Sequence, residues 1–241
     1  MTSRAEAVRE EFDSLAEDYE FKRWFSDRGQ WENYRAMRET LRQHLPTQVM
    51  HCLEVGCGPG TWTRFFLQLH PNARFTLVDI SPEMLSQAKL SLGLRKNITY
   101  VQGDFLTAEL PAGHDFFFSS RAVEYVQDKG AFCRRIHGLL AEGGKGIIVT
   151  KNPEMLSRRL ERLLRRPISD VHSGRIGPHQ LRSAMKAAGF RDIKVYPCVV
   201  SFPPGRKSFS LSRVLWRRMH SKELSQRWSW LAESYLLTFM R

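Results

Sequence analysis

The segment LEVGCGPG at residues 53–60 joins an apolar run to three glycines at alternate positions, Gly56, Gly58 and Gly60. A glycine turn between a strand and a helix lets backbone N–H groups come close to a ligand, and it points the positive end of the helix at that ligand. These residues therefore predict a pocket for a nucleotide-like molecule.

The rest of the turn argues against a dinucleotide. A dinucleotide-binding turn has the spacing G-x-G-x-x-G, but the sixth position here is Thr61. Pro59 also lacks the N–H that a pyrophosphate would need. A ligand with a ribose and no phosphate requires only the close approach, so NAD and FAD are disfavoured.

Two carboxylates follow at the ends of the next two apolar runs. Asp79 can accept hydrogen bonds from both hydroxyls of a ribose. Asp104 can accept a hydrogen bond from the exocyclic amine of an adenine, while Ile80 or Phe105 packs on the ring. Because the ends of adjacent parallel strands line one crevice, we expect these side chains to lie close together.

The elements that position these residues alternate between strand and helix. Apolar runs occupy 52–56, 75–80, 98–104, 115–120 and 145–151, and helix-period stretches lie between them at 62–70, 82–92 and 131–144. Buried strands separated by helices are typical of a parallel sheet covered on both faces, which right-handed crossovers make a doubly wound α/β fold. A helix at 178–190 and strands at 192–202 and 233–241 complete the predicted domain.

Composition bounds the class of protein. At 241 residues we expect one domain, 1–241. The four cysteines show no CxxC spacing, so we expect a reduced, cytoplasmic protein and no metal site. No signal peptide begins the chain, and no run of 18 apolar residues predicts a transmembrane helix.

The chain resembles the class I S-adenosylmethionine-dependent methyltransferases, in the broad group that includes ubiquinone- and menaquinone-biosynthesis and small-molecule enzymes. The resemblance rests on LEVGCGPGTWT, LVDISPEML, VQGDF, FFSSRAVEYV and LLAEGGKGIIV, in that order. It implies a Rossmann-like sheet of seven mostly parallel strands with an antiparallel last strand. It also implies an N-terminal helical cap over 1–46 and a helical insert after the fifth strand.

The same resemblance implies site residues. S-adenosylmethionine, with S-adenosylhomocysteine as product, would contact Tyr19, Glu54, Gly56, Cys57, Gly58, Gly60, Asp79, Ile80, Met84, Gly103, Asp104, Phe105, Ser119, Ser120 and Arg121. Arg121, Glu124, Tyr125 and His172 are the candidates for contact with the acceptor or for catalysis. A base is needed only if the acceptor must lose a proton, and whether oxygen, nitrogen or carbon is methylated stays open.

The positive charge is concentrated in the second half of the chain. Residues 1–120 hold 13 Lys/Arg and 16 Asp/Glu, whereas residues 121–241 hold 24 and 9. Basic amphipathic helices are predicted in the insert at 152–177 and over 206–234. They either cover the sheet and expose arginine to water, or contact an anionic membrane surface or a lipophilic acceptor, or follow RNA phosphates.

The sequence as a whole favours a methyltransferase acting on a small acceptor that is lipophilic or membrane-associated. The protein would then be cytoplasmic and peripheral on the inner face of a membrane. An RNA methyltransferase and a non-catalytic S-adenosylmethionine-binding regulator are the alternatives, and RNA ranks below the small acceptor because no added RNA-binding module is evident. The oligomeric state is not predicted.

Overall fold

The computed structural model describes residues 3–155, 174–200 and 209–241. Most of the predicted insert at 152–177, including His172, lies outside these ranges, as does the start of the 206–234 stretch.

In the described residues, seven strands form one sheet in the order β3-β2-β1-β4-β5-β7-β6. The first five strands pair in parallel, and β7 pairs antiparallel with both β5 and β6. The strands are β1 His51–Val55, β2 Arg74–Asp79, β3 Ile98–Gln102, β4 His114–Ser120, β5 Leu140–Lys151, β6 Arg191–Val200 and β7 Ala232–Met240. The doubly wound, Rossmann-like sheet with its antiparallel last strand is therefore confirmed.

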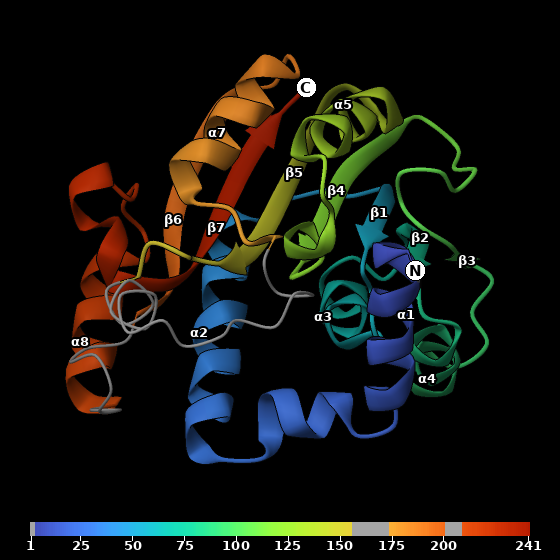
Figure 1. Cartoon of the computed structure of the whole chain (residues 1–241), viewed down its shortest axis with the longest axis horizontal. Coiled ribbons are helices and arrows are strands. Elements are labelled where there is room, and N and C mark those ends of the chain that lie inside the picture. Colours follow the sequence, from blue (N-terminus) through green and yellow to red (C-terminus); the bar gives the residue numbers. More distant parts are fainter. Residues whose placement is uncertain (1–2, 156–173, 201–208) are drawn as a thin grey trace.

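The helices lie on both faces of this sheet (Figure 1). Helices α2, α3 and α4 pack on one face, and α5 and α7 pack on the other. The helices are α1 Arg4–Leu15, α2 Arg28–His44, α3 Thr61–Leu69, α4 Pro82–Leu92, α5 Lys129–Leu139, α7 Pro178–Ala187 and α8 Phe209–Met219. Short turns of helix add η1 Phe21–Phe25, η2 Val123–Tyr125 and η4 Gln226–Leu231.

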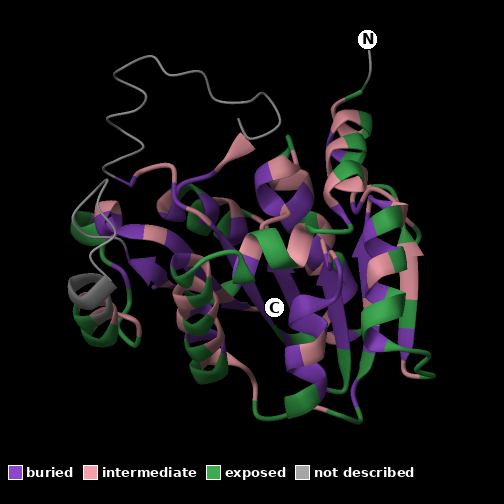
Figure 2. Cartoon of the chain, turned by 90° about the horizontal axis from the view of Figure 1, so that it is seen from below, coloured by how far each residue is buried: buried purple, intermediate pink, exposed green. Residues whose placement is uncertain are grey.

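The core consists of two apolar layers, one on each side of the sheet. Alternate residues of one strand enter opposite layers, since Phe116 and Phe118 of β4 pack towards α3 while Phe117 packs towards α5. Figure 2 shows the strands in the buried colour and the helices buried along the sides that face the sheet. Burial on both faces explains why the strands read as continuous apolar runs.

Tertiary pairing changes one predicted boundary. The predicted helix at 131–144 was wrong at its end, because α5 stops at Leu139 and β5 begins at Leu140. Residues 143 and 144 pair with the last residue of the chain: Gly143 N donates to Arg241 O at 3.2 Å, and Arg241 N donates to Gly144 O at 2.9 Å. Pairing with a strand almost 100 residues away overrides the local helical pattern.

Within 206–234, α8 packs against β6, and the tail of the stretch is the turn η4 followed by β7, rather than a second α-helix. None of the helices in the described ranges is long and apolar enough to cross a membrane.

Candidate active site

A cavity of about 380 Å³ opens at the carboxyl ends of β1, β2, β3 and β4. Its wall includes the loop after β1, the end of β2, the Gly103-Asp104-Phe105 turn after β3 and the Ser120-Arg121 pair after β4. This size is in the range of pockets for small molecules and cofactors. The strand ends that were predicted to lie close together therefore border one cavity.

The three glycines of the loop have different neighbours. All three have left-handed backbones, with φ of +70° at Gly56, +53° at Gly58 and +80° at Gly60. A Cβ at Gly56 would lie 2.5 Å from the Cβ of Ala122, and one at Gly60 would lie 2.9 Å from Leu92. At Gly58 the nearest atom would be the sulfur of Met84 at 4.0 Å, so only this glycine faces open space, and that space is the cavity.

Asp79 links the loop to the end of β2. Its carboxylate accepts hydrogen bonds from Gly58 N at 2.8 Å and from Ser81 N at 3.0 Å, and it lines the cavity. Burial raises the pKa of Asp79 to about 6, against the opposing effect of these backbone donors. A carboxylate has about four acceptor positions, so Asp79 keeps capacity for the hydroxyls of a ligand.

The turn after β3 forms another part of the wall. Asp104 accepts a hydrogen bond from Leu106 N at 2.9 Å, which holds its side chain at the end of the strand. Phe105 is buried and makes an edge contact with Phe132, 5.2 Å between ring centroids. Both residues line the cavity, so a flat heterocycle could meet a carboxylate and an aromatic ring there.

The N-terminal helix covers the cavity. Helix α1 is held to the start of α4 by Ser81 Oγ, which donates to Asp13 Oδ1 at 2.6 Å. Phe12 from α1 makes edge contacts with Tyr19 and with Tyr125, at 6.0 Å and 5.1 Å between centroids. All three aromatic residues line the cavity, so the cover shields it from water with aromatic side chains.

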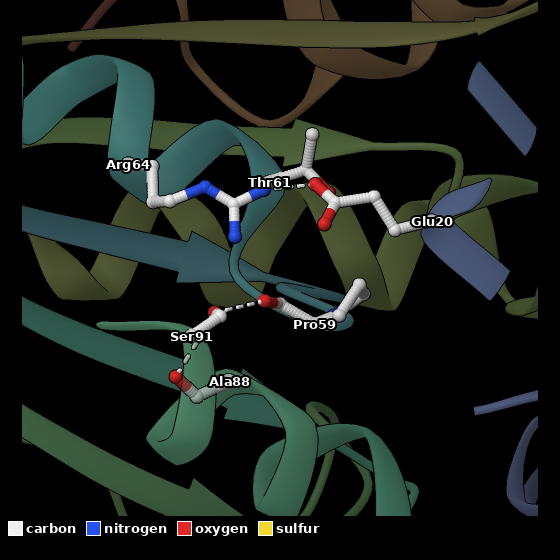
Figure 3. A network of polar contacts seen from close by, with 6 residues as sticks. All are labelled: Glu20, Pro59, Thr61, Arg64, Ala88 and Ser91. Atoms are coloured by element: carbon white, nitrogen blue, oxygen red, sulfur yellow. Dashed lines mark hydrogen bonds and ion pairs between the residues drawn. The ribbon is translucent and has the colours of Figure 1, made fainter. Parts of the chain in front are cut away.

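Two polar contacts hold the glycine loop from opposite sides (Figure 3). Glu20, between α1 and η1, accepts a hydrogen bond from Thr61 Oγ1 at 2.7 Å and pairs with Arg64 of α3. On the other side, Ser91 of α4 donates to the carbonyl of Pro59 at 2.6 Å. The N-terminal cap and α4 therefore both fix the loop that borders the cavity.

Comparison with known proteins decides the family of this chain. Residues 52–144, which hold the glycine loop and the ends of β1 to β4, match the family model described as a methyltransferase domain. The domain at residues 52–144 is that of a class I S-adenosylmethionine-dependent methyltransferase.

Named relatives include two enzymes with different acceptors. The chain is 29% identical over 121 residues to malonyl-[acyl-carrier protein] O-methyltransferase 1 of Ilyobacter polytropus, covering 48% of this chain and 45% of that protein. It is 28% identical over 134 residues to trans-aconitate 2-methyltransferase of Afipia carboxidovorans, covering 56% and 50%. The chain thus spans about half the length of the curated relatives it matches, and the ubiquinone-related subgroup stays a prediction.

A solved structure shares the fold over the whole chain. Phosphoethanolamine N-methyltransferase 2 of Haemonchus contortus, in complex with S-adenosyl-L-methionine, superposes with a TM-score of 0.68 at 19% identity. The match covers 100% of this chain and 60% of that one.

The residues present in this methyltransferase fit the family's cofactor. The open space beside Gly58 allows a ligand to approach the backbone, Asp79 and Asp104 are carboxylates at successive strand ends, and the aromatic cover suits an adenosyl group. We propose that these residues hold S-adenosylmethionine, with Tyr19 over it. The other predicted contacts that line the cavity are Gly56, Cys57, Ile80, Met84, Gly103, Phe105, Ser120 and Arg121.

Three predicted cofactor contacts lie away from the cavity wall. Gly60 packs against α4, and Ser119 is buried between neighbouring strands. Glu54 is also buried and accepts a hydrogen bond from Thr63 Oγ1 at 2.7 Å. Burial raises the pKa of Glu54 to about 8, so at neutral pH it is mainly a neutral acid that fixes α3 on β1.

The predicted acceptor residues divide in a similar way. Arg121 and Tyr125 line the cavity. Glu124 is fully buried instead, and its carboxylate pairs with Arg121 Nη1 at 3.8 Å and with Arg175 Nε at 3.3 Å. These ion pairs make Glu124 a positioning residue for two arginines.

Sequence reasoning missed several residues of the methyltransferase site. Trp24 and Trp62 line the cavity and meet edge to face at 5.5 Å. Val8 lines it too, one helical turn before Phe12, and this spacing on α1 was a usable signal. Trp62 is the second residue of α3, two positions after Gly60, but an aromatic residue at the start of a core helix gives no sign of facing a ligand.

Proposed function

We propose that this methyltransferase transfers a methyl group from S-adenosylmethionine to a small-molecule acceptor. The observation that carries the proposal is the cavity that brings Gly58, Asp79, Asp104 and Arg121 together at one end of the sheet. Bound S-adenosylmethionine would supply a methyl group on a positively charged sulfur, which is a good leaving group. The protein then has to align the acceptor and exclude water.

The cover supports a small acceptor. Phe12 makes edge contacts with both Tyr19 and Tyr125 in this cover, and Arg4 Nε donates to Tyr125 O at 3.3 Å across the same region. An acceptor that meets the cofactor beneath this cover has to be compact, or has to present a narrow reactive end. This geometry favours a small acceptor over duplex or structured RNA, whose bases would have to be extruded.

Two measurements test the proposal. Isothermal titration calorimetry with S-adenosylmethionine and with S-adenosylhomocysteine should show one saturable site for each. The chain should then transfer label from [methyl-³H]S-adenosylmethionine to a metabolite fraction of low molecular mass, in preference to total RNA or to a lipid extract of the same cells.

Each outcome has a distinct meaning. Binding without transfer to any of the three fractions would leave a non-catalytic binding protein. Label in RNA that is released by RNase, or label in the lipid extract alone, would contradict the small-molecule acceptor. Failure to bind either form of the cofactor would contradict the proposal at its first step.

A further inference from the structure

Positive side chains gather behind Arg121, where β4 and β5 end. Arg121 and Arg175 share the single carboxylate of Glu124, and their side chains are only 12% and 11% exposed. Among the described residues, the Nε of Arg121 is buried and has no hydrogen-bond partner. The shared carboxylate therefore does not satisfy both guanidinium groups.

Lys151 adds a further cation to this group. It is the last residue of β5, and Arg121 is held to the same strand because its N–H donates to Val149 O at 2.8 Å. The charge of Arg121 is the first cause, and burial the second, that lowers the pKa of Lys151 to about 7. Because Ser120 pairs with Val149 in the register of β4 and β5, Lys151 lies at the same edge of the sheet as Arg121.

Arg23 approaches the same place from the N-terminal cap. Burial lowers the pKa of Arg23 to about 10, with Arg121 as the next cause and Tyr19 and Glu233 acting against it. In the described part of the chain, Arg121 and Arg175 thus pair with one carboxylate, Lys151 ends the neighbouring strand, and Arg23 acts electrostatically on Arg121 and Lys151. Glu124 and Glu233 are the carboxylates that act on these side chains. We name Arg23, Arg121, Lys151 and Arg175 the cation cluster.

An excess of buried positive charge is unfavourable unless an anion joins it, because like charges repel strongly where water is scarce. Arg121 also has a left-handed backbone, with φ of 69°, which is uncommon for a residue other than glycine and is found at ligand clamps. Both features point to a binding role for Arg121, which lines the cavity.

Resting on the proposed function, we infer that the methyl acceptor carries a carboxylate or phosphate group, which Arg121, Lys151 and Arg23 hold at the ends of β4 and β5. Arg121 is the member of these three that lines the cavity, so it joins the cofactor region to the anion site. Glu124 and Arg175 fix the position of Arg121. Carboxylate and phosphate are the shapes that a guanidinium fork matches best.

The cofactor itself has a carboxylate, on its methionyl end. The alternative is that the cation cluster binds this carboxylate and not an anionic group of the acceptor. Lys151 and Arg23 do not belong to the cavity wall, whereas the loop residues proposed to hold the cofactor do. Substitution of Lys151 should therefore separate the two sources, because it should affect an acceptor anion and leave the cofactor in place.

The test uses the full chain saturated with S-adenosylhomocysteine and titrated with malonate, inorganic phosphate or neutral malonamide in a calorimeter. Malonate or phosphate should bind saturably, and malonamide should not. Lys151→Met should weaken anion binding at least about tenfold and leave the affinity for S-adenosylhomocysteine within about twofold. Since Lys151 titrates near pH 7, anion affinity in the unsubstituted chain should also fall as the pH rises above about 7.

Two matched controls accompany these variants. Lys145→Met removes an exposed lysine from the middle of β5, six residues before Lys151, and it should change neither affinity. Arg23→Met should behave like Lys151→Met, whereas Lys22→Met, at an exposed neighbour paired with Asp18, should not. Agreement of the two cluster variants, each against its control, excludes a general loss of folding as the cause.

Three results would overturn the inference. Malonate and phosphate binding no better than malonamide would remove the anion site while leaving methyl transfer intact. A loss of S-adenosylhomocysteine affinity in Lys151→Met as large as the loss for malonate would assign the cluster to the cofactor's own carboxylate. If S-adenosylhomocysteine does not bind but malonate still does, the site is not an acceptor site and the proposed function also fails.

Discussion

Replacing Gly58 by alanine separates the role of the loop in binding from its role in folding. A Cβ there would meet only the sulfur of Met84, at 4.0 Å, so the protein itself has room for the methyl group. The left-handed backbone, with φ of +53°, costs an alanine about 1–2 kcal/mol. For a chain of 241 residues this corresponds to a fall in Tm of about 2–8 °C.

Gly58→Ala should weaken cofactor binding more than its small loss of stability alone would predict. The added methyl group points into the cavity, where the cofactor is proposed to approach the backbone, so the affinity for S-adenosylhomocysteine should fall at least about tenfold, or ~1.4 kcal/mol. Calorimetry measures this affinity, and thermal unfolding without ligand measures the change in stability.

Gly93→Ala is the matched control for backbone strain. Gly93 ends α4 with φ of +71°, no atom lies within 4 Å of a Cβ placed there, and it does not line the cavity. With ψ of 179°, Gly93 lies in a backbone region that essentially only glycine adopts, so Gly93→Ala should lose at least as much Tm as Gly58→Ala and no affinity. Gly56→Ala should lose more stability than Gly58→Ala, because its Cβ would lie 2.5 Å from Ala122. If Gly58→Ala binds S-adenosylhomocysteine as tightly as Gly93→Ala does, the loop does not face the ligand and the assignment of the cavity is wrong.

Three further outcomes concern buried carboxyl groups. With a pKa of about 6, Asp79 should lose its acceptor capacity as the pH falls through 6, so the affinity for S-adenosylhomocysteine, measured by calorimetry, should fall with the pH. In Asp79→Asn this affinity should not depend on pH over the same range. If Asp79→Asn shows the same pH dependence as the unsubstituted chain, Asp79 does not contact the ligand. Glu54 has a pKa raised from 4.5 to about 8, so between these pH values the folded chain retains a proton that the unfolded chain loses. The free energy of unfolding, measured in urea, should therefore fall as the pH rises from 4.5 through 8. If Glu54→Gln shows the same fall, the pH dependence does not come from Glu54. Glu124→Gln should lower the free energy of unfolding by about 3–5 kcal/mol because two buried arginines lose their carboxylate. Glu223→Gln, in an exposed ion pair, should change it by less than about 1 kcal/mol, and equal losses in the two variants would refute the burial argument.

The cofactor side of the site could be predicted from local sequence. The glycine turn, Asp79 and Asp104 each follow an apolar run directly, and parallel strands bring their carboxyl ends to one edge without any long-range information. The same reasoning could not tell that Gly60 serves the packing of α4, because a left-handed glycine looks the same in a sequence whether a ligand or a leucine lies beside it. Neighbours in space, and not the motif, decide which glycine faces the cavity.

Burial in the core also decides whether an acidic residue near a strand end can contact a ligand. Glu54 and Asp79 both sit at the carboxyl ends of strands, and both were predicted to contact the cofactor. Glu54 points into the layer beneath α3 and bonds Thr63, whereas Asp79 lines the cavity and bonds Gly58 N. Glu54 pairs with Leu77 in the register of β1 and β2, so it lies on the same face of the sheet as Asp79 but two residues further from the strand end. A difference of two residues is small against the uncertainty of a predicted strand end.

The two halves of the site therefore differ in how far apart their residues lie in the chain. Residues 55–106 and 120–122 supply most of the wall of the cavity proposed to hold the cofactor, through consecutive strand ends, so a motif can predict the reaction class. The cation cluster instead takes Arg23 from the cap, Lys151 from the end of β5 and Arg175 from beyond it, and these positions share no local pattern. Arg121 belongs to both halves, which explains why one residue carries a strained backbone, a cavity position and an ion pair. The residues proposed to bind the acceptor are therefore brought together only by the tertiary structure. The excess of positive side chains around Arg121 is the observation from which we infer that the acceptor is an anion.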